Sequence, residues 1–251
     1  MEVSLYQAAA AMNATERWQE LISENLGISS IPGARKQEVS FSAIQAGLAS
    51  TTSGSVTPGY VIPSASTVTN FSQGESHPTG NATDLALEGP GLFTLQMPDG
   101  QPAYTRNGQF KINAQNQLVT AQGFPVLGDS GPIQFAANSS KNSQPITVSA
   151  TGQVSQGDEV KGKLQIAEFS QPNQLTSIGS GLFRADDPSL KPTGNSTTQV
   201  RQGSIESANS SPTKEMASLV TAMRMFESNQ KVLQMQSDRM SREITDLGTP
   251  A

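Results

Sequence analysis

Cysteine is absent from this 251-residue chain, and histidine occurs once, as His77. The missing cysteine excludes disulfide bridges, thiolate metal sites and cysteine nucleophiles. A lone imidazole in a segment rich in proline and glycine forms neither a metal cluster nor a catalytic constellation. We therefore predict no metal, no other cofactor and no catalytic residue.

Long apolar runs and an excess of positive charge are also missing. No stretch approaches the roughly 18 to 20 apolar residues that a membrane-spanning helix needs. The amino-terminal stretch lacks the positive start and apolar stretch of a secretory signal, which predicts a cytoplasmic protein or one exported without cleavage. The net charge of -5 argues against the basic face of a nucleic-acid binder.

Enzyme motifs are missing as well. The chain has no GxSxG, P-loop, GxGxxG or HExxH pattern. Two pairs of adjacent acids, Asp158-Glu159 and Asp186-Asp187, are interpreted as solvated turns, because neighbouring side chains of an extended chain diverge. Aromatic residues make up only 5% of the chain, which indicates a modest core. We expect a protein that is not an enzyme and binds no small-molecule substrate.

Amphipathic helices are predicted at both ends of the chain. Residues 4–26 follow a capping pattern at Ser4, and residues 212–247 start at a proline and stop at Gly248. The first apolar stripe contains Leu5, Ala8, Met12, Trp18, Leu21, Ile22 and Leu26. The second contains Leu219, Phe226, Leu233, Met240 and Leu247, with Met216, Met223 and Ile244 at the interleaved heptad position.

These stripes need apolar partners. A helix of about 36 residues would reach about 54 Å, which a small β domain could not cover. The two helices can pair with each other as a coiled-coil-like hairpin, or they can pack against other molecules. Pairing within the chain does not exclude assembly between chains.

The middle of the chain has the pattern of short antiparallel strands. Pro98-Asp99-Gly100 is predicted to be a turn, and Asn107-Gly108 a tight hairpin. Many short strands separated by turns predict a mixed α and β fold with a small central β barrel or sandwich. The predicted divisions are residues 1–45 (first helix), 46–83 (extended connector), 84–203 (β domain) and 204–251 (carboxy-terminal segment and long helix).

Several runs follow one another in the order seen in a known family. They are Asn25-Leu26, Asp84 through Gly91, Tyr104-Thr105-Arg106-Asn107-Gly108 with Phe110, Gly123 through Gly128, Glu206 through Asn209, and Phe226-Glu227. On these residues the chain resembles the bacterial flagellar rod proteins of the axial rod and hook family. Its length and residues 123–128 are most similar to the proximal rod member, with the distal rod member as the near rival.

The resemblance implies a structural subunit of the flagellar basal body. Both terminal helices would form the inner layer of a helical tube that transmits torque for flagellum-dependent motility. The implied partners are copies of the chain, other axial rod proteins and the flagellar type III export apparatus. The implied location is the periplasm-spanning rod, reached without a cleaved signal peptide. The expected interface residues are Leu5, Met12, Trp18, Ile22, Leu26, Met216, Leu219, Met223, Phe226 and Leu233.

A second class of function remains open at this point. The same pattern fits a secreted β-domain binding or adhesion protein whose helices form a stalk. Such a protein would stay discrete at high concentration, whereas a rod subunit would polymerise.

Overall fold

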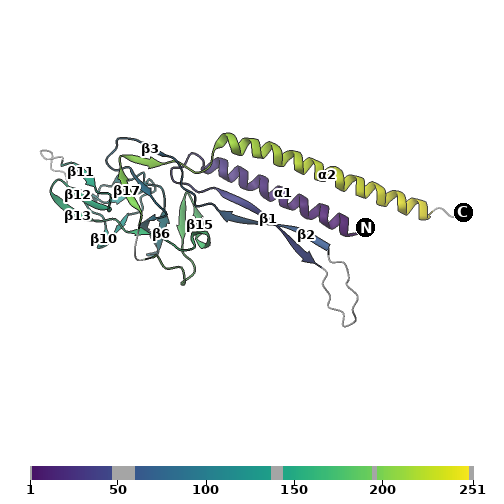
Figure 1. Cartoon of the computed structure of the whole chain (residues 1–251), viewed down its shortest axis with the longest axis horizontal. Helices are drawn as coiled ribbons and strands as arrows, with labels where there is room; N and C mark the ends of the chain where they lie inside the picture. Colours follow the sequence, from purple (N-terminus) through teal and green to yellow (C-terminus); the bar gives the residue numbers. More distant parts are fainter. Residues whose placement is uncertain (1, 47–59, 137–143, 194–196, 249–251) are drawn as a thin grey trace. The chain divides into compact units, whose positions relative to one another are not determined.

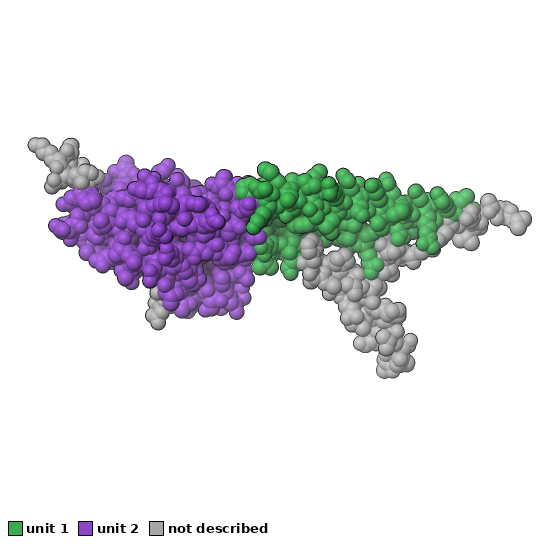
Figure 2. Space-filling view, turned by 45° about the horizontal axis from the view of Figure 1, so that its top comes forward, with its two compact units in different colours: residues 1–26, 37–68, 212–251 green, residues 27–36, 69–211 purple. Residues whose placement is uncertain are grey.

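The structure, a computed structural model, describes residues 2–46, 60–136, 144–193 and 197–248. The chain divides into two compact units, coloured separately in Figure 2. The helical unit comprises Met1–Leu26, Gln37–Val68 and Pro212–Ala251, and the β unit comprises Gly27–Lys36 and Thr69–Ser211. Each unit is thus built from segments that are distant in the sequence.

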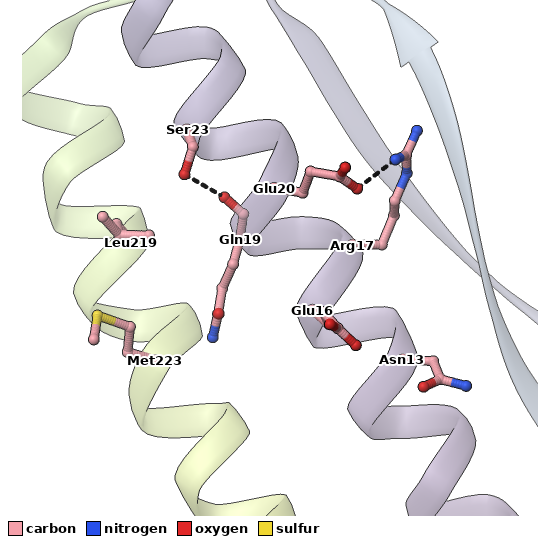
Figure 3. A pocket seen from close by; sticks show the side chains of 8 residues that line it. All are labelled: Asn13, Glu16, Arg17, Gln19, Glu20, Ser23, Leu219 and Met223. Carbon is pink, nitrogen blue, oxygen red and sulfur yellow. Dashed lines mark hydrogen bonds and ion pairs between the residues drawn. The ribbon is translucent and has the colours of Figure 1, made fainter.

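Two long helices dominate the helical unit. Helix α1 spans Glu2–Ile28 and helix α2 spans Pro212–Gly248. They run side by side in opposite directions, as Figures 1 and 3 show. Both predicted helices are confirmed, but α1 starts at Glu2, so Ser4 lies inside the helix and not at a cap.

A two-stranded sheet completes the helical unit. Strand β1 spans Gln37–Ala46 and pairs with β2, which spans Tyr60–Thr69. The side chain of Asn25 joins α1 to this sheet, since its amide nitrogen donates to the Gln37 carbonyl (2.7 Å) and its amide oxygen accepts from the Gln37 N–H (2.8 Å).

The β unit consists of many short strands. They are β3 Ser76–Pro78, β4 Leu85–Glu88, β5 Leu92–Gln96, β6 Pro102–Thr105, β7 Lys111–Ile112, β8 Leu118–Val119, β9 Leu127–Gly128, β10 Gly131–Pro132, β11 Ile146–Val148, β12 Gln153–Gln156, β13 Glu159–Lys163, β14 Ile166–Ala167, β15 Thr176–Gly179, β16 Leu182–Arg184, β17 Gln199–Gln202 and β18 Ser204–Glu206. The largest sheet has the order β14-β5-β6-β16-β15 and is antiparallel.

The expected barrel is not found among the described residues. The five-stranded sheet ends at β14 and β15, which do not pair with each other, so it does not close. The other strands form one three-stranded sheet, β11-β12-β13, and the two-stranded pairs β17-β4, β18-β3, β7-β8 and β10-β9. Strands of two to five residues form ladders that are too short to wrap into a closed barrel. The fold is therefore mixed α and β, with several small antiparallel sheets.

Two apolar clusters form the core of the β unit. The larger one is built around Leu85, Phe93 and Phe110, whose two rings meet edge to face at 5.0 Å. The smaller one contains Tyr104 and Phe169, whose rings meet edge to face at 4.8 Å. Edge-to-face contacts place the positive edge of one ring on the negative face of the other.

Of the two predicted turns, one is confirmed and one is wrong. Gly100 has φ +79° and joins β5 to β6, as the Pro98-Asp99-Gly100 pattern predicts. Asn107-Gly108 forms no tight hairpin, since neither residue has positive φ and the strand that follows, β7, pairs with β8. Gly108 is needed for a different reason: a Cβ there would lie 1.6 Å from the Leu85 carbonyl oxygen. The Leu85 N–H also donates to the Gly108 carbonyl at 3.0 Å.

Candidate assembly surface and the residues that support it

Arg106, the charged residue of the central motif, lies in the interior of the β unit. Its side chain is 1% exposed. The guanidinium donates from Nε to Glu206 Oε2 (2.6 Å) and from Nη2 to the Leu87 carbonyl (2.6 Å), and Nη1 donates to the Gly91 carbonyl. A planar guanidinium with five fixed N–H donors suits such a multiple contact. Arg106 is therefore a structural anchor and is not available to a partner.

Glu206 connects two further parts of the chain, residues 33–35 and Gly74, to Arg106. Its Oε1 accepts from Arg35 Nη1 (2.7 Å) and from the Gly74 N–H (2.8 Å), and its carbonyl accepts from the Gly33 N–H (2.7 Å). The carboxylate is 1% exposed and the Arg35 side chain 2%. Burial lowers the pKa of the Arg35 guanidinium, and the charge of Glu206 opposes that shift. One buried acid thus holds two buried cations.

A second polar anchor surrounds Asn209. Its side-chain oxygen accepts from the Lys36 N–H at 2.7 Å, and its amide nitrogen donates to the Asn70 and Ser72 carbonyls at 2.8 and 3.0 Å. The Asn209 N–H donates to the Ala34 carbonyl at 3.2 Å. These bonds fasten residues 34–36 and 70–72 to the segment that precedes α2.

The other motif residues also have structural positions in the β unit. Asp84 is buried, and its Oδ2 accepts from the Thr79 hydroxyl (2.7 Å) and the Asn81 amide (3.0 Å). The buried hydroxyl of Thr105 donates to the Gly181 carbonyl at 2.9 Å. The Gly91 N–H donates to the Thr198 hydroxyl at 2.8 Å, where a Cβ on Gly91 would clash. Asn107 orders the next turn by accepting from the Gln109 N–H at 2.9 Å.

Sequence reasoning did not single out Arg35, Asn209 or Glu206 as site residues. Glu206 and Asn209 appeared only as members of a motif. The sequence does contain a weak signal for these residues. Only 15% of the chain is charged, yet Arg35 and Glu206 stand among small residues. The pairs themselves are 100 and 171 positions apart, and periodicity carries no information at that range.

The expected interface residues of α1 lie mainly on its covered side. Ile22 is 2% exposed, and Met12, Trp18 and Leu26 are half-buried. The side chain of Leu5 lies outside the residues whose side chains are described. The exposed positions of α1 between residues 7 and 28 are all polar or glycine: Asn13, Glu16, Arg17, Glu20, Ser23, Glu24 and Gly27.

On α2 the expected interface residues separate into two groups. Leu219, Phe226 and Leu233 are half-buried and face the covered side of the helix. Met216 is 58% exposed and Met223 is 51% exposed. The sequence predicts that the line through Met216 and Met223 is covered. In the structure the covered line lies one residue earlier and contains Glu215, Ala222, Asn229 and Gln236. Met216 and Met223 therefore lie outside the covered side of the helix, and the motif residue Glu227 is exposed too.

A groove of about 670 Å³ runs between the two helices. It is lined by Leu219 and Met223 of α2 and by polar residues of α1 that include Glu16 and Gln19. Figure 3 shows Gln19 reaching toward α2, and Arg17 on the side of α1 away from it. The groove is open, and six of its eight lining residues are polar side chains of α1. Small-molecule sites are usually concave and mostly apolar, so this groove has more the character of a packing surface.

The described residues show neither a membrane-spanning helix nor a metal-binding cluster. None of the described helices is long and apolar enough to cross a membrane. No group of three or more potential metal-ligating side chains occurs in the part of the chain that the structure describes.

Comparison with known proteins gives the family. Residues 86–156 match the family described as "Flagellar hook protein FlgE/F/G D1 domain", and residues 201–247 match "Flagellar basal body rod FlgEFG protein C-terminal". The chain is 32% identical to flagellar basal-body rod protein FlgG of Borreliella burgdorferi, over 94% of this chain and 95% of that protein.

Relatives of both named types align over almost their whole length. The chain is 28% identical to FlgG of Buchnera aphidicola subsp. Schizaphis graminum, covering 97% of this chain and 99% of the relative. It is also 28% identical to FlgF of Caulobacter vibrioides, covering 99% of both. Buried anchors at the motif residues, two long terminal helices and these full-length matches agree, and the chain belongs to the family of flagellar basal-body rod proteins.

Proposed function

We propose that this protein is a structural subunit of the flagellar basal-body rod and polymerises through its two long helices into the axial shaft that transmits torque. Members of this family are structural proteins and not enzymes, and they belong to the flagellum. Family membership also favours the rod over the alternative of a secreted β-domain adhesion protein. The partners are copies of the chain and other rod and hook components.

The observation that carries the proposal is the outer surface of α2. Six large apolar side chains there are between 37% and 62% exposed: Met216, Val220, Met223, Met225, Val232 and Met235. Full burial of one such side chain is worth about 1.5–3 kcal/mol. Several such side chains exposed on one helix therefore favour association, and methionine adapts well to a neighbouring surface.

The proposal also covers the role of the helix pair, the rod protein that this chain corresponds to, and its route out of the cytoplasm. The antiparallel helices act as a coiled-coil-like pair in the inner layer of the tube, with the β unit outside. The chain length and residues 123–128 support the proximal rod member. The subunit travels through the flagellar type III export apparatus without a cleaved signal peptide and reaches the periplasm-spanning rod.

Aspartate substitutions on α2 test this proposal. Met223→Asp places a charge on a side chain that is 51% exposed, so the isolated chain should fold normally while rod assembly fails. Val160→Asp on β13 is the matched control, because Val160 is 59% exposed in the β unit. The readout is the presence of rods in isolated basal bodies, together with motility. Normal rods with Met223→Asp would contradict the assignment of this surface.

Phe226→Asp and Leu219→Asp make a second pair of tests. Both residues are half-buried within the helical unit, so these substitutions should abolish assembly and loosen α2 as well. The β unit should keep its fold, which amide exchange can follow separately. Rods formed by either variant would show that the covered face of α2 is not required.

A further inference from the structure

The outward faces of α1 and α2 carry opposite charge. On α1, the exposed positions from Asn13 to Gly27 hold three acids, Glu16, Glu20 and Glu24, against one cation, Arg17. The exposed positions of α2 from residue 214 to residue 242 hold five cations against two acids. Both rows are exposed in the single chain, although Glu16 and Glu20 also line the groove between α1 and α2.

The charged residues are arranged as rows. Glu16, Glu20 and Glu24 are four residues apart, so they follow one another along one side of α1. Arg224 and Lys231 are seven residues apart, about two helical turns, and share one side of α2. At about 1.5 Å per residue, Glu16 and Glu24 are about 12 Å apart along their axis, and Arg224 and Lys231 about 10.5 Å apart. The two rows are therefore opposite in charge and nearly equal in spacing.

We propose that the acidic row of α1 in one molecule docks on the basic row of α2 in the next molecule of the same chain. This inference deepens the proposed rod function and rests on it. A symmetric contact of α2 with α2 would oppose like charges, and so would α1 with α1. Only the unlike pairing is attractive, and it leaves a free α1 row at one end and a free α2 row at the other. A head-to-tail contact of this kind extends into a filament.

Residues beside the rows give the contact its apolar part. Met223 and Val220 lie on α2 next to Arg224 and are about half exposed. Arg17, the one cation on the outer side of α1, is paired with Glu20 three residues on, so it weakens the acidic row but does not reverse it. The long stems of Arg224 and Lys231 can lie on the methionine surface while their charged ends reach the acids.

Charge reversal provides the test. One variant carries Glu16→Lys and Glu24→Lys, and the other carries Arg224→Glu and Lys231→Glu. Alone, each full-length variant should need about tenfold more protein than the natural chain to associate, measured by light scattering at low salt. An equal mixture should associate like the natural chain, since each reversed row then finds its complement on the other molecule. A chain with both reversals should recover alone.

A matched control distinguishes the loss of this contact from a general effect of net charge on association. Lys111→Glu with Lys191→Glu changes the net charge by the same amount as the α2 variant, and both residues are exposed in the β unit. This control should associate like the natural chain, and circular dichroism verifies that every variant is helical. Single-face variants that associate normally, or a mixture that does not recover, would overturn the docking.

Cross-linking in basal bodies gives an independent test, because the natural chain has no cysteine. Glu20→Cys together with Lys231→Cys, treated with a short bismaleimide, should yield a ladder of covalent multimers. Glu20→Cys alone should yield no ladder. If rods form but the double variant gives no ladder, the docking is wrong while the rod function stands. If Met223→Asp also leaves the rods intact, the proposed α2 assembly surface is wrong as well.

Discussion

Replacing Glu206 with glutamine should destabilise the β unit more than any change on its surface. Glutamine keeps the size and shape of the side chain but removes the negative charge. Glu206 accepts from Arg35 Nη1 at 2.7 Å and from Arg106 Nε at 2.6 Å, and all three side chains are at most 2% exposed. The variant therefore leaves two guanidinium groups in the interior without a counter-charge.

The expected size of the effect follows from this burial. Removing one partner of a buried ion pair costs about 3–5 kcal/mol, because the remaining charge stays desolvated. A domain has a total stability of only about 5–15 kcal/mol, so the loss is a large fraction of it. Glu88→Gln is the matched control: Glu88 pairs with Arg201 at 3.4 Å, and both side chains are more than half exposed. That change should stay within about 0.5 kcal/mol.

Amide hydrogen exchange in the full chain measures this loss. The N–H groups of Leu118 and Val126 lie in the core of the β unit and donate to the Ile133 and Leu118 carbonyls at 3.0 and 2.9 Å. In Glu206→Gln they should exchange about a hundredfold to a few thousandfold faster. Adding Arg35→Met should recover part of the loss, since it removes one orphaned cation. Unchanged exchange, or a further loss on adding Arg35→Met, would refute the ionic account.

Three further changes test the β unit. Gly108→Ala should lower the free energy of unfolding by about 3 kcal/mol or more, because its Cβ would meet the Leu85 carbonyl. Gly123→Ala, at φ +93° with open space around it, should lower it by only about 1–2 kcal/mol. Thermal melts compare the two variants. Thr198→Val removes the hydroxyl that donates to Glu168 at 2.6 Å and should cost about 1–3 kcal/mol in the same assay. Burial raises the pKa of Tyr104 above its ordinary value of 10.0, so the unfolded chain loses this proton first and stability should fall as the pH rises past about 10. Tyr104→Phe should remove that loss, measured by denaturation at pH 8 and pH 11.

The sequence predicts the local parts of this fold well. The ends of both helices agree with the structure within about two residues, because caps and apolar periodicity act over one or two turns. The turn at Gly100 is found for the same reason. Side-chain direction is less well predicted. On α2, Ala222 is buried and Met223 is exposed, although the apolar stripe includes Met223. Packing against a particular neighbour decides which residues of a broad apolar stripe become buried.

The long-range parts could not be predicted from local pattern. The pattern predicts a turn at Gly108, yet this glycine allows the close approach of the Leu85 backbone, which lies in a strand more than twenty positions earlier. The barrel was wrong because turn spacing fixes the number of strands but not which strands pair. Strand β1 has apolar residues at alternate positions, Val39 and Phe41, but this alternation is too short to predict a strand by itself.

The separation of Glu206 from its partners has a consequence for the biogenesis of the protein. Arg35 and Arg106 enter the chain 171 and 100 positions before the acid that neutralises them. A nascent or truncated polypeptide that ends before residue 206 would have to bury two cations alone, which is prohibitive. The interior of the β unit can therefore close around its three buried charges only after residue 206 has been added to the chain.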